Sequence, residues 1–274
     1  MPRLLQGTRE TDASLGRRAP SAVRLRLHGE LRDLPGPRRR GGITVIPAPG
    51  HATVKDLLES RGVPHTEVSA VTADGRTVDG SYRPQGGERL AAFPWRWRGR
   101  GPRSAGRRGA PRRLRFVLDV HLGTLARWLR LMGFDALYRR DYRDDEIAAA
   151  AEKESRVVLT RDTGLLKHKR IRYGRWLRAT APEDQWREVG RRYLAGRRAR
   201  PLSRCPACNG TLRCEDTREA VKHVPPETAR NVTRFMRCRA CGRFYWRGAH
   251  APGLRRRLKR LLARGGLAGK TLPG

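Results

Sequence analysis

Short segments in which apolar and polar residues alternate, each followed by turn-forming residues, characterise the first part of the chain. Alternation with a period of two is the pattern of a β-strand with one buried face. One helical segment lies among them, with Thr53 as its N-cap and Gly62 at its end. The predicted strands cover residues 23–27, 44–46 and 89–93, the helix covers 54–60, and a hairpin turn covers 73–76. This order predicts a β-grasp domain over residues 21–95.

The apolar pattern then changes to one in which short strands alternate with helices. A fully apolar run such as residues 116–118 is typical of a buried parallel strand. The predicted strands cover residues 116–118, 134–138 and 156–160, and the predicted helices cover residues 122–129, 144–154 and 182–193. A β-α-β-α-β order indicates a parallel sheet with helices on both faces. The fold class predicted for residues 115–200 is therefore α/β.

The remaining segments differ in composition from these two units. Residues 1–20 are polar and rich in Arg, which predicts a disordered tail. The stretch over residues 96–114 is rich in Arg, contains no acidic residue and is predicted to be a linker. Two interpretations are equally favoured. In the first, the stretch is a plain solvated linker, and Trp95 and Trp97 close the first domain. In the second, it is a flexible arm on RNA phosphates, and the two tryptophans stack on bases. Residues 252–274 form a basic tail whose first half, 254–262, is compatible with a helix.

The charge balance points to a polyanionic partner. The 61 basic and 26 acidic residues give a net charge of +35, a field that attracts nucleic acid. Arg outnumbers Lys by 54 to 7, which the codon bias of a GC-rich genome would explain, but such a bias does not explain the shortage of acids. No apolar run reaches the roughly 18 residues of a membrane span, and no signal peptide is apparent. We therefore expect RNA as a partner, no membrane association and a cytoplasmic location.

Acidic residues, although scarce, occur where the predicted sheet would place a site. Asp119 follows the first strand of the α/β unit, Asp162 follows the third, and Asp144 and Asp145 begin the helix between the second and third strands. Ligands of open α/β sheets bind at the carboxyl ends of the strands. Carboxylates gathered there would repel one another without a cation, and hard oxygen ligands select Mg²⁺ or Mn²⁺. The alternative is that Asp144 is an N-cap and Asp162 a turn residue.

Cysteines concentrate in one short region. Cys205 and Cys208 form one Cys-x-x-Cys pair, and Cys238 and Cys241 form another. Two such pairs complete a closed tetrahedral site, which predicts structural Zn²⁺ in a zinc ribbon over residues 201–251. Two disulfides are the alternative, and they would require an oxidising compartment. The remaining cysteine, Cys214, is expected to be a small core residue.

Two stretches of the α/β unit resemble a known family. FVLDVHLGTLARWLRLMGFD over residues 116–135 and RVVLTRD over residues 156–162 look like the Mut-seven C-terminal (Mut-C) RNase family, a branch of the PIN-like nucleases. The Cys-x-x-Cys-Gly-x-x-Tyr-Trp run in the second cysteine pair is typical of the same family. The resemblance implies a PIN-like fold and a ribonuclease whose metal-binding acids are Asp119, Asp144, Asp145 and Asp162.

Three arginines are candidate contacts for RNA phosphates. Arg127 and Arg130 lie on the face of the first α/β helix opposite Leu122 and Leu129, and Arg161 stands beside Asp162. The alternative is that they are part of an ordinary solvated surface.

The segment TVKDLLESRGVPHTEV over residues 53–68 resembles the ubiquitin-like domain that precedes the Mut-C RNase, which is related to the ThiS and MoaD sulfur carriers. Those carriers end in a free Gly-Gly, whereas this chain continues and its Gly41-Gly42 is internal. A binding or positioning role is therefore preferred to sulfur carriage, with a protein as one candidate partner.

These interpretations combine into a metal-dependent ribonuclease that hydrolyses RNA phosphodiester bonds, with catalytic Mg²⁺ or Mn²⁺ and structural Zn²⁺. A non-catalytic RNA- or ribosome-binding protein is the alternative, in which the acids only cap and turn. The toxin of a toxin–antitoxin pair is a third option, which the three-part architecture disfavours.

Overall fold

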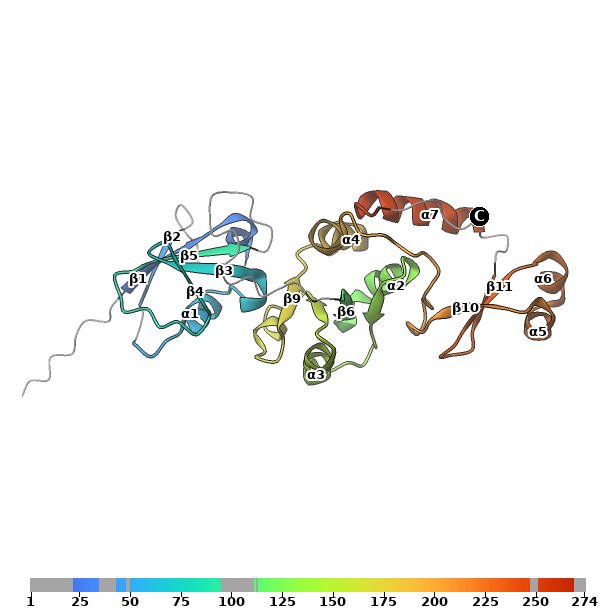
Figure 1. The fold of residues 1–274 in the computed structure, drawn as a ribbon, viewed down its shortest axis with the longest axis horizontal. Helices are drawn as coiled ribbons and strands as arrows, with labels where there is room; N and C mark the ends of the chain where they lie inside the picture. The colour runs from blue at the N-terminus through green and yellow to red at the C-terminus, as the bar shows by residue number, and fades with distance from the viewer. Residues whose placement is uncertain are drawn as a thin grey trace, which may run out of the picture.

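Three units follow one another along the chain and lie in a row in the computed structural model (Figure 1). The structure describes residues 22–34, 43–47, 50–94, 111, 113–246 and 251–268. The predictions for the tail over residues 1–20, for Trp95 and Trp97 and for most of the linker lie outside the described residues.

The first unit is a five-stranded sheet with one helix packed on it. Its main elements are β1 (Ala22–Leu27), β2 (Ile43–Pro47), α1 (Val54–Ser60), β3 (Val68–Ala73), β4 (Arg76–Val78) and β5 (Arg89–Pro94), with 3-10 helices at Gly29–Asp33 and His65–Glu67. The strand order is β2-β1-β5-β3-β4, with β1 parallel to β5 and every other pair antiparallel. Thr53 caps α1 through a capping box with Asp56. The predicted β-grasp fold is confirmed.

The central unit is a four-stranded parallel sheet. Its strands are β6 (Arg115–Leu118), β7 (Asp135–Leu137), β8 (Val157–Thr160) and β9 (Tyr173–Trp176), and its helices are α2 (Gly123–Leu131), α3 (Asp144–Glu154) and α4 (Pro182–Val189), with a π-helical turn at Gly190–Leu194 and 3-10 turns at Val120–Leu122 and Leu165–Lys167. The strand order is β7-β6-β8-β9, and all neighbours pair in parallel. The α/β prediction is confirmed.

Helices cover both faces of this sheet, as its apolar strands require. Along β6, Phe116 and Leu118 belong to a core shared with α2 and α4, whereas Val117 belongs to a second core shared with α3. The carboxyl ends of the strands therefore lie along an edge of the sheet, between the helices that cover its two faces.

Strand β9 is the element that the hydrophobic pattern did not predict. Its sequence is Tyr-Gly-Arg-Trp, and Arg175 in the middle is only 5% exposed. A buried arginine does not follow from a periodic apolar pattern, because its burial depends on carboxylates supplied by another unit.

The segment expected to be a basic tail instead contributes to the core of the central unit. Helix α7 (Ala251–Arg264) buries Leu258 and Leu261 in the core shared with α2 and α4. The indole Nε1 of Trp186 in α4 donates to the carbonyl of Leu261 at 2.8 Å. The sequence was compatible with a helix over residues 254–262, but the packing of this helix was not predicted, because its apolar stripe is flanked by many arginines.

The cysteine-containing unit is an antiparallel sheet with the order β10-β11-β12. Its elements are β10 (Leu212–Glu215), α5 (Thr217–Ala220), α6 (Pro226–Asn231), β11 (Phe235–Cys238) and β12 (Phe244–Trp246), with a 3-10 turn at Val221–His223. The expectation that Cys214 is a core residue is wrong, because Cys214 is exposed. It lies on an edge strand of a small sheet whose core covers Leu212 but does not extend over Cys214. Among the described residues, none of the helices combines the length and apolar character needed to cross a bilayer.

Candidate functional site

Two of the predicted acids lie at one edge of the central sheet. Asp119 directly follows β6, and Asp162 comes two residues after β8. β6 and β8 are adjacent parallel strands with Leu118 opposite Leu159, so their carboxyl ends coincide. The structure thus brings Asp119 and Asp162 to the same edge rather than to opposite sides of the sheet.

Thr160 joins these two acids through hydrogen bonds. Its hydroxyl donates to Asp119 Oδ2 at 2.7 Å and accepts from the backbone N–H of Asp162 at 2.8 Å. Asp119 Oδ1 accepts from the N–H of Val120 at 2.6 Å, and the Asp119 side chain is 8% exposed. Both oxygens of Asp119 are therefore fixed in orientation, while a carboxylate still has lone pairs for a cation. Thr160 is a site residue that the sequence reasoning did not single out.

Asp162 takes part in a turn as well as in the cluster. Its Oδ1 accepts from the N–H of Gly164 at 2.7 Å, which is the turn role considered as an alternative. One hydrogen bond occupies a fraction of the accepting capacity of a carboxylate, so the turn role and a ligand role are compatible.

Asp144 approaches the same edge from the N-terminus of α3. Burial and the negative charges of Asp162 and Asp119 raise its pKa. The three carboxylates do not, however, form a group whose oxygens all lie within 4.8 Å of one another. The N-cap position is occupied by Arg143, whose N–H donates to the Glu146 side chain at 3.0 Å. Since the helix is capped without it, the interpretation of Asp144 as an N-cap is wrong.

Asp145 lies at the rim of this cluster. Its side chain is 64% exposed and forms an ion pair with Arg143 Nη2 at 3.2 Å. It adds to the negative potential at Asp144, but less than Asp162 and Asp119 do.

His168 is a second residue that the sequence reasoning missed. It ends the 3-10 turn after β8, is half-buried, and lowers the pKa of Asp144, opposing the effect of the carboxylates. No motif marks this histidine in the sequence, so only the fold reveals its place beside the acids.

The three candidate arginines have different surroundings. Arg127 and Arg161 are exposed, as predicted. The expectation that Arg130 is on a solvated helix face is wrong, because it is 4% exposed. Its guanidinium donates to the carbonyls of Ala136 at 2.8 Å and Ala207 at 2.7 Å, and so fixes the first cysteine turn against β7. Arg130 is a structural residue without a free donor face for RNA.

A carboxylate at β7 joins the cysteine unit to the central unit. Asp135 accepts from Arg156 at 2.7 Å, from Asn209 at 2.8 Å and from Arg204 at 3.1 Å. Burial alone would raise the pKa of Asp135, but the hydrogen bonds from Arg156 and Asn209 outweigh it and lower the pKa. Asn209 lies directly after Cys208, so this network orients the first cysteine turn.

The four predicted cysteines converge. The Sγ atoms of Cys205, Cys208, Cys238 and Cys241 all lie within 4.8 Å of one another, the only such group of potential metal-binding side chains among the described residues. The Sγ atoms of Cys205 and Cys241 are 3.8 Å apart, and those of Cys208 and Cys238 are 3.4 Å apart. A tetrahedral ion with Zn–S bonds of about 2.3 Å requires S···S separations of roughly 3.8 Å. The four cysteines are free and share one site, which favours a metal ion over two disulfides.

The first unit contacts the central unit through buried charges at β9. Glu67 is fully buried and accepts from Arg175 Nη1 at 2.8 Å and from the N–H of Trp176 at 2.7 Å. Glu30 accepts from Arg175 at 3.0 Å and from Arg192 at 2.6 Å. Burial would raise the pKa of Glu30, but the two arginines more than offset it and lower the pKa.

Two models of protein families match this chain. The model described as the Mut7-C RNAse domain matches residues 114–258, which is more than half of the 274 residues. The model described as Mut7-C ubiquitin matches residues 20–98. Comparisons with curated proteins and with solved structures give no match. The resemblance predicted from the sequence is confirmed, and the chain belongs to the Mut7-C RNase family, with the ubiquitin-like domain preceding the RNase domain.

Proposed function

We propose that the protein is a metal-dependent ribonuclease whose site is the carboxylate cluster at the edge formed by β6 and β8. The observation that supports this proposal best is that Asp119 and Asp162 follow two adjacent parallel strands and are linked through Thr160. Asp144 is near enough for both acids to raise its pKa. Three acids from distant parts of a strongly basic chain share one electrostatic environment at the place where α/β sheets bind ligands. Perturbed carboxylates in such a position are typical of a functional site.

Asp119, Asp144 and Asp162 are the residues that would bind Mg²⁺ or Mn²⁺. Such an ion activates water and stabilises the leaving oxygen of a phosphodiester when bound. Unlike the thiolates, the oxygens of these acids do not form a group within 4.8 Å of one another. We therefore propose that waters of the ion bridge part of the gap, since Mg²⁺ usually keeps several waters and few carboxylates. Thr160 and the N–H of Val120 orient Asp119, and Asp145 contributes negative charge at the rim.

RNA is the proposed substrate. The net charge of +35 attracts a polyanion, and the exposed Arg127 and Arg161 are proposed to contact its phosphates. Arg161 stands next to Asp162, so a phosphate at the carboxylate cluster would be within its reach. The four thiolates are proposed to bind structural Zn²⁺, because a closed tetrathiolate site suits that ion and provides no open position for catalysis.

The test is cleavage of end-labelled RNA with Mg²⁺ or Mn²⁺ by the full chain and by Asp119→Asn and Asp162→Asn. We expect each substitution to lower the cleavage rate by about 100-fold or more, because a lost ligand weakens both ion binding and charge stabilisation. Asp141→Asn is the matched control, since Asp141 is exposed and pairs with Arg139 outside the cluster. Equal cleavage rates for the unmodified chain and all three variants would contradict the carboxylate cluster as the site of cleavage, and no cleavage by the unmodified chain would favour RNA binding without catalysis.

A further inference from the structure

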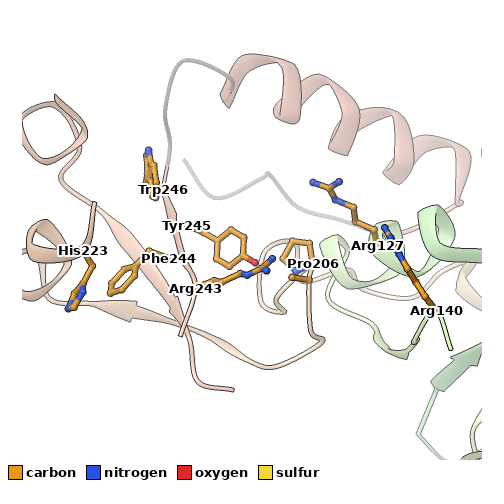
Figure 2. A pocket seen from close by; sticks show the side chains of 9 residues that line it. Arg127, Arg140, Pro206, His223, Arg243, Phe244, Tyr245 and Trp246 are labelled. Carbon is orange, nitrogen blue, oxygen red and sulfur yellow. The ribbon is translucent and has the colours of Figure 1, made fainter. Parts of the chain in front are cut away.

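A groove of about 710 Å³ separates the RNase fold from the cysteine ribbon. Figure 2 shows Arg127 and Arg140 on one side of the groove, and Arg243, Tyr245 and Trp246 of the ribbon on the other. This volume is in the range of pockets that enclose drug-sized molecules, which corresponds to one or two nucleotides.

The arginines that line the groove differ from those around it. Neighbouring arginines form ion pairs: Arg139 with Asp141 at 3.0 Å, and Arg143 with Asp145 at 3.2 Å. In contrast, Arg127, Arg140 and Arg243 are exposed and form no ion pair or hydrogen bond through their side chains with the described residues. None of the described residues that line the groove is acidic. Three cations that face one hollow without a partner in the described part of the chain predict an anionic occupant.

Of the aromatic residues that line the groove, Trp246 has the ring that is most open to stacking with a base. Phe244 is engaged by the His223 ring at 5.2 Å and by the guanidinium of Arg237 at 5.3 Å. The hydroxyl of Tyr245 contacts Cys205 Sγ at 2.9 Å. Trp246 is 40% exposed, the only exposed large aromatic residue among those described. A partly exposed indole beside unpaired arginines is the combination that binds unpaired bases and their phosphates.

The groove is next to the edge that contains the acids. Arg140 lies in the loop between β7 and α3, four residues before Asp144. The hydroxyl of Tyr138, in the same loop, donates to the carbonyl of Val120, the residue after Asp119. β7, the edge strand that contacts the ribbon, is two strand spacings, about 10 Å, from β8, the strand that precedes Asp162.

We propose that this groove binds the single-stranded part of an RNA substrate, with a base stacked on Trp246 and phosphates at Arg127, Arg140 and Arg243. The inference rests on the proposed ribonuclease function and assigns it a substrate class. A duplex is disfavoured because its bases are already stacked on each other and cannot offer a free face to the indole. The ribbon is then part of the binding site as well as a metal-stabilised fold element.

Binding and cleavage are measured separately to test the groove. In an Asp119→Asn background without added divalent ions, fluorescence anisotropy gives the affinity of a labelled single-stranded RNA and of the same sequence as a duplex. Trp246→Leu is expected to weaken single-strand binding by about 5- to 100-fold and to leave duplex binding unchanged, whereas Trp246→Phe retains most of the affinity. Zinc content verifies that the ribbon remains folded, since Trp246 also contacts Phe235.

The arginines provide a second and independent readout. Replacing Arg127, Arg140 and Arg243 together by Ala is expected to reduce the slope of log affinity against log salt by about 0.7 for each lost phosphate contact. Arg213→Ala, an exposed arginine on β10 outside the groove, is the matched control for Arg243→Ala. Unchanged single-strand affinity in both Trp246→Leu and the triple variant would overturn the groove proposal even if the protein cleaves RNA. Loss of affinity in these variants in a protein that cleaves nothing would support the groove and overturn the nuclease.

Discussion

Two aspartates that are adjacent in the sequence have different surroundings in the fold. Asp144 shares the environment of Asp119 and Asp162, and its pKa is raised by burial and by those charges. Asp145 is exposed and forms an ion pair with Arg143. The pair differs because the side chains of consecutive residues leave a helix in different directions. Of the two residues, Asp144 is therefore the one whose ionised form is disfavoured by the neighbouring carboxylates.

The raised pKa of Asp144 predicts a pH-dependent stability of the metal-free site. A carboxyl whose pKa is higher in the fold than in the unfolded chain stabilises the fold when protonated. That contribution is present below the ordinary aspartate pKa and is lost as the pH rises through the raised value. Asp144→Asn removes the opposed charge. Without added divalent ions we expect this variant to melt at a slightly higher temperature than the unmodified chain at pH 7, with the difference shrinking toward pH 4.

Added Mn²⁺ should reverse this order. A ligand at 100 times its dissociation constant stabilises the fold by about 2.7 kcal/mol, and Asp144→Asn should gain much less than the unmodified chain because it lacks a ligand. The exposed Asp145→Asn is the matched control and should respond to Mn²⁺ almost as the unmodified chain does. Equal responses of the two variants in thermal melts would contradict the assignment of Asp144 to the ion.

Single residues also show where reasoning from the sequence ends. The placement of Asp119 and Asp162 followed from the strand pattern, because each acid comes at or just after the end of a strand of one parallel sheet. Arg127 and Arg130 could not be distinguished, since both lie away from the apolar stripe of the helix. Arg130 is buried by the first cysteine turn, through the carbonyls of Pro206 and Ala207, and by β7, through the carbonyl of Ala136. Contacts of this kind have no periodic signature.

At the scale of elements, the pattern predicted what is locally determined. The end of α2 at Gly133 is such a case, because Gly133 has φ +88°, a backbone conformation that glycine adopts freely and other residues rarely do. The segment of α7 was expected to be a basic tail compatible with a helix and not a core element, and β9 was missed. Both depend on partners from distant parts of the chain, which a local pattern does not contain.

The cysteine ribbon gives a prediction about an element stabilised by a metal. Cys241→Ser removes one of four thiolates from the site, whereas Cys214→Ser removes an exposed thiol of the same sheet. We expect about one Zn²⁺ per chain in the unmodified protein and in Cys214→Ser, and a large loss of bound zinc in Cys241→Ser, because Zn²⁺ binding is coupled to folding of such small units. Metal content by elemental analysis is the measurement. Equal zinc in both variants would show that the tetrathiolate is not the zinc site.

At the scale of the whole molecule, buried charged side chains connect the central sheet to another unit at each of its two edges. Asp135 joins the ribbon to β7, and Glu67 joins the ubiquitin-like domain to β9. The bond from Arg175 to Glu67 spans 108 positions of the sequence. Neither residue differs in the sequence from an ordinary surface charge, so the order of the units was predictable and their attachment was not.

The attachment at β9 also reaches the carboxylate cluster. Glu67 accepts from the N–H of Trp176, and the indole Nε1 of Trp176 donates to the carbonyl of Arg161 at 3.1 Å. Arg161 immediately precedes Asp162. Two hydrogen bonds therefore connect the ubiquitin-like domain to the residue before Asp162. We propose that the domain helps to position this acid.

Glu67→Ala tests this attachment. Removing one partner of a buried ion pair leaves Arg175 less compensated, and we expect a loss of about 3 kcal/mol in the free energy of unfolding, measured with denaturant. Glu183→Ala, an exposed glutamate of α4, is the control and should be close to neutral. Combining Glu67→Met with Arg175→Met should recover much of the loss, because a packed apolar pair replaces the buried charges. Strictly additive losses would mean that the two side chains do not act as a pair. In a chain that cleaves RNA, the double variant should remain folded yet cleave more slowly, because Trp176 no longer has Glu67 to hold the backbone before Asp162.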